Sequence, residues 1–124
     1  MEQTLILQTT TAMIAMLAAG GLLMAGIRFS GRPHAPSWLA MGHGFLATAA
    51  LTLLIYAAFT VGLPLLAQVA LALFLMATCG GVLLNLGFHL KGVPLPKWLV
   101  VVHGALAIVG FLLLLSATWT ASHA

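Results

Sequence analysis

The amino-acid sequence predicts an all-α protein, a transmembrane four-helix bundle built from two tandem helix hairpins. The first observation is composition: of 124 residues, 63% are hydrophobic and 4% are charged. A soluble domain has about a quarter of its residues charged, so this chain cannot cover a water-facing surface. The second is that four apolar segments each approach the ~20 residues that a membrane-spanning helix needs. The third is that the sequence matches itself at an offset of 60 residues.

Four spans follow one another with short connections. The predicted spans run from Leu5 or Thr9 to Ile27, from Trp38 to about Thr60, from about Leu65 to Phe88, and from Trp98 to about Trp119. The connections, residues 28–36, 61–64 and 90–97, contain proline and glycine, which end helices. Connections this short require neighbouring helices to be antiparallel.

The basic residues predict an orientation. Arg28 and Arg32 lie in the first connection, and Lys91 and Lys97 in the third. By the positive-inside rule these two connections are cytoplasmic and both termini lie outside. We interpret the compact loops and the charge bias as indicating a bacterial inner membrane. Four cations are too few for a nucleic-acid surface, so nucleic acid is not an expected partner.

The repeat is carried by one motif and one glycine pair. The pattern Pro-x-Trp-Leu-x-x-x-His-Gly-x-Leu-Ala occupies residues 36–47 and again 96–107, and Gly20-Gly21 recurs as Gly80-Gly81. We expect one membrane domain, residues 1–124, with repeat 1 at about 1–60 and repeat 2 at about 61–124. Each repeat has two spans, so both enter the membrane in the same direction and are related by an axis along its normal.

The repeat predicts a layer of histidines and glycines. His43 lies five residues beyond Trp38, roughly 8 Å inside the basic edge at 1.5 Å per residue. His103 lies at the same distance from Trp98. The glycine pairs of the other two spans lie roughly 10 Å from the same edge. Ionisable side chains within a span point to function, and the two histidine-bearing spans would face each other.

This layer predicts a haem site. Haem iron accepts two axial imidazoles, and helix bundles build cofactor sites from facing helices. We therefore expect His43 and His103 as metal ligands. Glycines would admit the flat macrocycle, and the cations would pair with its propionates. The expected cofactor-binding residues are Gly20, Gly21, Gly44, Gly80, Gly81, Gly104, Arg28, Arg32, Lys91 and Lys97.

Other polar residues have simpler interpretations. His89 and Asn85 could support the site, but His89 is better interpreted as an interfacial side chain that reaches water. Asn85 is expected to hydrogen-bond a neighbouring helix. His34 and His123 receive no role. Cys79, the one cysteine, cannot form an internal disulfide.

Several other functions remain open or are excluded. Glycine pairs in membrane helices also serve close packing, and the main alternative is a non-catalytic structural or assembly subunit of a larger membrane complex. Proton-coupled cation export is disfavoured because the chain has no aspartate and its one glutamate is Glu2. A zinc enzyme is also disfavoured, because zinc catalysis generally needs three protein ligands and the histidine layer offers two. A Cu(I) site that adds Met41 to the histidines is a minor alternative. No nucleotide-binding motif is present.

The pattern also resembles a known family. His43-Gly44 and His103-Gly104 on alternate helices, with glycines level on the other two, resemble the four-helix membrane b-type cytochromes, of which the cytochrome b561 group is the best known. The resemblance covers most of the chain in architecture and few residues in motif. It implies haem b, ligation by His43 and His103, and membrane electron transfer, often with a quinone.

One departure from that family limits the path of electrons. The b561-type proteins commonly hold two haems, one near each face, whereas the outer half of this chain has no histidine within a span. A redox partner protein, a second copy or a quinone would have to complete the path. We therefore expect an electron carrier in contact with membrane lipid rather than an independent enzyme, either in a homo-oligomer or in a hetero-oligomer. The sequence has no Cys-x-x-Cys-His for covalent haem attachment.

Overall fold

The computed structural model describes all 124 residues as a bundle of long helices without strands. The helices are α1 (Glu2–Phe29), α2 (Ser37–Thr60), α3 (Leu65–Val82) and α4 (Lys97–His123). After α3 the chain continues as the π-helical segment η1 (Leu83–Phe88) and the 3₁₀ turn η2 (His89–Lys91). Four segments are long and apolar enough to cross a membrane: α1, α2, α3 with its extension to Lys91, and α4. The predicted transmembrane four-helix bundle is confirmed.

Proline and glycine set the ends of the helices. Pro36, Pro64 and Pro96 directly precede α2, α3 and α4. The carbonyl groups of Pro36 and Pro96 accept the first amide hydrogen bonds of their helices. Proline removes no helical hydrogen bond at this position, because an amide N–H there would have no acceptor within the helix. Gly31 lies in the first connection with a φ of 106°, a backbone conformation that favours glycine.

The structure differs from the sequence expectation at three helix ends. α1 begins at Glu2 rather than at Leu5 or Thr9, and α4 continues past Trp119 to His123. Hydropathy marks the apolar part of a helix, whereas its backbone hydrogen bonds continue through polar residues. The third predicted span is α-helical only to Val82 and then widens to π-helical bonding. Apolar periodicity does not report this change, which often occurs at functional sites.

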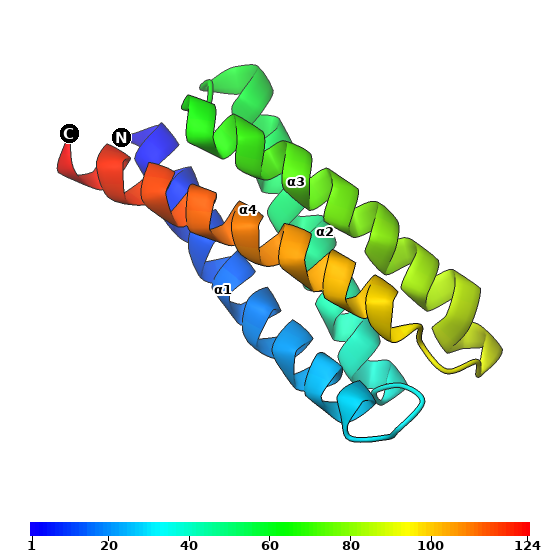
Figure 1. The fold of residues 1–124 in the computed structure, drawn as a ribbon. Helices are drawn as coiled ribbons and strands as arrows, with labels where there is room; N and C mark the ends of the chain where they lie inside the picture. Colours follow the sequence, from blue (N-terminus) through cyan, green and yellow to red (C-terminus); the bar gives the residue numbers. More distant parts are fainter.

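The four helices form a ring in which α2 and α4 occupy opposite corners. α1 packs against α2 and α4, and α3 packs against α4 and more loosely against α2. Both termini lie at one end of the bundle, together with the α2–α3 turn, and the other two connections lie at the opposite end (Figure 1). Those two connections touch, because the amide of Leu95 donates to the carbonyl of Pro33 at 3.1 Å.

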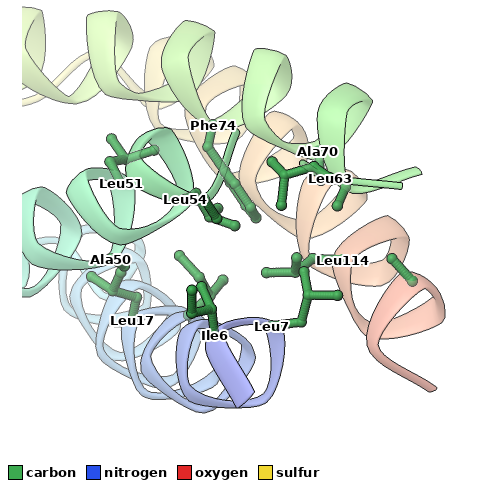
Figure 2. Packing of buried hydrophobic residues seen from close by; sticks show 14 residues of the cluster. Ile6, Leu7, Leu17, Ala50, Leu51, Leu54, Leu63, Ala70, Phe74 and Leu114 are labelled. Atoms are coloured by element: carbon green, nitrogen blue, oxygen red, sulfur yellow. The ribbon is translucent and has the colours of Figure 1, made fainter. Parts of the chain in front are cut away.

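The hydrophobic core fills the half of the bundle near the termini. Figure 2 shows side chains from all four helices meeting there, among them the fully buried Leu7, Leu54 and Leu114. Buried alanines such as Ala50 and Ala67 allow the helices to approach closely. The histidine layer lies beyond this core, toward the basic connections. One half of the bundle is therefore close-packed, and the other half carries the candidate site.

Candidate functional site

His43 of α2 and His103 of α4 meet inside the bundle. Their ring centres are 6.4 Å apart and their planes are inclined at 62°. Both side chains are half-buried and line the same cavity. Because α2 and α4 are at opposite corners, the two rings approach each other across the bundle interior. The structure thus brings together the two histidines that the repeat singles out.

A hydrogen bond fixes the tautomer of His103. Its Nδ1 lies 2.6 Å from the carbonyl oxygen of Ala77 on α3. A carbonyl only accepts, so Nδ1 must carry the proton. In the neutral ring Nε2 then keeps its lone pair, which is the state that binds a metal. A metal-ligating histidine usually makes this kind of second hydrogen bond.

His43 lacks the corresponding hydrogen bond. Its Nδ1 is buried and has no hydrogen-bond partner in the protein. The residue that corresponds to Ala77 in the first hairpin is Leu17, but no hydrogen bond joins the Leu17 carbonyl to His43. A buried polar nitrogen without a partner is costly and is unusual enough in a native fold to need an explanation.

The glycine pairs make room for the two rings. A β-carbon on Gly21 would lie 3.3 Å from Cε1 of His43, and one on Gly81 would lie 3.0 Å from Cε1 of His103. β-Carbons on Gly20 and Gly80 would also contact these histidines. The glycines therefore pack directly against the imidazoles, whereas the sequence pattern predicts that they lie beside a macrocycle.

The spacing of the rings suits one metal ion between them. A bond between a first-row metal and an imidazole nitrogen is about 2 Å long. The distance from an imidazole nitrogen to the centre of its ring follows from ring bonds of ordinary C–N length. Two rings on opposite sides of one ion therefore have centres roughly 6 Å apart. The observed separation is 6.4 Å. The structure holds no group of three or more histidine, cysteine or acidic side chains that could bind a metal.

Two cavities adjoin the histidine layer. The first, of about 130 Å³, lies among all four helices and is lined mainly by apolar residues together with both histidines. The second, of about 190 Å³, lies between α1 and α2. His43 and Leu17 border both. Each volume is below the ~300–1,000 Å³ of typical small-molecule pockets, so neither cavity has room for a flat macrocycle with the helices as they stand in this structure.

The remaining predicted cofactor residues occupy different positions. Gly104 lines the first cavity, whereas Gly44 is exposed with nothing near its β-position.

All four cations lie at the basic end of the bundle, beyond the histidine layer. The guanidinium of Arg28 donates from Nε to the carbonyl of Leu95 at 2.8 Å. The Lys97 ammonium lies 5.5 Å from the centre of the Phe29 ring, and Arg32 and Lys91 are exposed.

The interpretation of His89 as a side chain reaching water is wrong. His89 is only 8% exposed. Its ring centre lies 4.3 Å from that of His34, and its Nε2 lies 3.3 Å from the hydroxyl of Ser37. The 3₁₀ turn after η1 directs the ring under the first connection, a packing that sequence position does not reveal. His34 likewise has a structural contact that the sequence did not suggest.

Asn85, Met41 and Cys79 all lie away from the contact between the two histidines. Asn85 is half-buried in η1 and makes no side-chain hydrogen bond, so the expected bond to a neighbouring helix is wrong. Met41 is 57% exposed and lines neither cavity beside the histidines, which removes the support for a three-ligand Cu(I) site. Cys79 is exposed.

Sequence reasoning missed the carbonyl group of Ala77. A backbone acceptor has no signature in residue type, and the only available signal was that Ala77 lies one helical turn before Gly81. No family model, curated protein or solved structure matches the chain. The geometry of the site is therefore the basis for any assignment of function.

Proposed function

We propose that the protein is a membrane electron carrier that holds one haem b between His43 and His103. The observation that carries the proposal is the pair of imidazoles on opposite helices, 6.4 Å apart between ring centres. His103 is additionally held in the tautomer that leaves Nε2 free. Two nitrogen donors without a third side chain match the ligation of a haem iron by two axial histidines.

Each residue of the site has a definite task in this proposal. The Ala77 carbonyl orients His103 through Nδ1, and this hydrogen bond raises the basicity of the ring as a ligand. Gly21 and Gly81 let the rings stand against α1 and α3. The apolar walls of the cavity exclude water. The bound haem would supply one-electron exchange at its iron.

The basic end supports the same proposal electrostatically. Arg28, Arg32, Lys91 and Lys97 are the only cationic side chains in the chain apart from histidine, and they lie at the end nearest the histidines. They would neutralise the propionates of a haem. No acidic side chain lies at that end to pair with these cations, because the one acidic residue of the chain, Glu2, lies at the opposite end.

Orientation and partners follow from the position of the histidine layer. We propose that the basic connections face the cytoplasm of a bacterial inner membrane and that the two hairpins are a duplication. The site then lies near the cytoplasmic face. One site at this depth does not bridge the membrane, so a quinone, a redox partner protein or a second copy of the chain would exchange electrons with it.

A reduced-minus-oxidised absorption spectrum of the purified protein in detergent tests the proposal. We expect sharp low-spin bands in the wild type, their loss in both His43→Ala and His103→Ala, and their retention in His123→Ala, which alters an exposed histidine. A colourless protein from haem-replete cells would refute haem binding and favour the structural-subunit alternative. Low-spin bands that survive either ligand substitution would refute the facing pair.

A further inference from the structure

We infer that in the haem-free protein the pair of His43 and His103 is a two-coordinate site for a single Cu(I) ion. The inference does not rest on a bound haem. Neither cavity beside the pair has room for a macrocycle with the helices as they stand, whereas a bare ion needs only the gap between the two rings. The separation of the rings, their orientation, the number of donors and the local charge each point to this ion.

The separation of the two rings fits a linear arrangement. Two imidazoles on opposite sides of one ion have centres roughly 6 Å apart, whereas the same bonds at a tetrahedral angle would bring the centres to roughly 5 Å. The observed distance between the rings of His43 and His103 is 6.4 Å. The inclination of 62° between the planes is compatible with a linear site, because rotation about a metal–nitrogen bond leaves the distance between the centres unchanged.

The orientation of the two rings leaves the same nitrogen available in each. A β-carbon on Gly20 would lie 3.8 Å from Nδ1 of His43, and one on Gly80 would lie 3.8 Å from Nδ1 of His103. The rings are therefore turned alike toward their neighbouring helices, and Nε2 is the ligand atom in both. The bond from His103 to the Ala77 carbonyl keeps the Nε2 lone pair free. Nδ1 of His43 is buried without a partner, a cost that a metal bond to this ring offsets.

The number of donors at the site suits Cu(I) better than a divalent metal. Zinc sites in proteins are almost always four-coordinate, but no third histidine, cysteine or acidic side chain joins the pair. Met41 is 57% exposed and lines neither cavity. The hydroxyl of Thr78, which lines the first cavity, already donates to the carbonyl of Phe74 at 2.8 Å. Imidazole is a good ligand for copper, and the filled d shell of Cu(I) allows stable linear complexes with two such ligands.

The charge around the site also favours a monovalent ion. Both imidazoles are neutral ligands, most of the other residues around the pair are hydrophobic, and the only acidic side chain, Glu2, lies at the opposite end of the bundle. A buried charge without a counter-charge is costly. The lysine and arginine side chains at the histidine end add a repulsion that is proportional to the charge of the ion. The site therefore favours Cu(I) over Cu(II) and Zn(II).

Anaerobic titration of the haem-free protein with Cu(I), in competition with a chromophoric chelator, tests the inference. All variants carry Cys79→Ser, because the exposed thiol is itself a ligand for Cu(I). We expect one Cu(I) per chain, and a loss of affinity in His43→Ala and His103→Ala that exceeds the ~100-fold upper range for loss of an outer hydrogen-bond partner. His123→Ala and His34→Ala, which breaks the other histidine pair, should bind normally. Undiminished binding in either ligand variant would overturn the inference.

X-ray absorption at the copper edge identifies the ligands in the loaded protein. We expect two nitrogen neighbours at about 2 Å and no sulfur, whereas a sulfur neighbour or a third ligand would overturn the two-coordinate site. His43→Met guards against a variant that merely unfolds, because it replaces the imidazole with a flexible thioether that also binds Cu(I). This variant should keep Cu(I) and show one nitrogen and one sulfur neighbour. Bound copper without the sulfur neighbour would place the ion elsewhere.

The outcomes separate this inference from the proposed function. Zn(II) at equal concentration should not displace Cu(I), and displacement would overturn the choice of metal. Haem bands in protein from haem-replete cells, together with no Cu(I) binding by the haem-free protein, overturn the inference and leave the haem site standing. Cu(I) binding by a protein that takes up no haem supports the inference and overturns the proposed function. A protein that binds neither overturns both.

Discussion

A β-carbon on Gly81 would lie 3.0 Å from Cε1 of His103, which is closer than side chains normally approach. The same relationship joins Gly21 to His43 at 3.3 Å. In each hairpin an imidazole thus packs against the glycine pair of the adjacent helix, where no side chain stands in the way. Because each glycine pair contacts its histidine directly, substitution of a glycine by alanine tests the contact.

Gly81→Ala should destabilise the protein and displace His103. Overpacking of this kind costs about 1–3 kcal/mol, which exceeds the gain of about 1 kcal/mol from alanine in a helix. Thermal unfolding in detergent and the position of the low-spin bands would measure both effects. Gly21→Ala should cost less, because its β-carbon would be farther from the ring. Gly26→Ala, with nothing within 4 Å of the new β-carbon, should be neutral or stabilising.

Gly110→Ala should be the most disruptive alanine substitution in the core half of the bundle. Its β-carbon would lie 2.8 Å from Cε1 of the buried Phe74 ring, and an aromatic ring in a packed core has little freedom to move. We expect a loss of about 1–3 kcal/mol in the free energy of unfolding. In a Phe74→Leu background the loss should shrink, and an unchanged loss would contradict the contact.

Thr11 and Thr118 should be energetically coupled. Their hydroxyl groups lie 2.7 Å apart in the buried contact between α1 and α4. Hydrogen bonds between membrane helices contribute about 0.6 kcal/mol on average, so a double-mutant cycle with Thr11→Val and Thr118→Val should give a coupling free energy near that value. The exposed Thr52 donates only within its own helix, and Thr52→Val should show no coupling to Thr118→Val.

The proposed orientation predicts a labelling pattern for introduced cysteines. In a Cys79→Ser background, Ala124→Cys at the exposed C-terminus should react with a membrane-impermeant maleimide in intact cells. Ser30→Cys, in the exposed first connection, should react only after the cells are lysed. The physical reason is the concentration of all lysine and arginine in the two connections at that end. The reverse pattern would place the histidine layer near the outer face.

Much of the bundle could be predicted because the signals are local. Apolar length gave the four spans, and Pro36 and Pro96 marked helix starts in the right places. The repeat predicted that His43 and His103 lie at one level on facing helices, and the rings do meet. The errors fall where local signals end. The change to π-helical bonding after Val82 and the burial of His89 depend on how the third connection packs against the first.

By itself the sequence determined that this chain forms four membrane-crossing helices and which residues share a depth along them, because apolarity and helical rise are properties of each segment alone. Only the tertiary structure decided that His103 is held by a carbonyl of α3 while His43 is not, and that free space lies beside His43. Backbone carbonyls and interhelical distances leave no mark in residue type. The difference between the two hairpins therefore arises only when the helices pack.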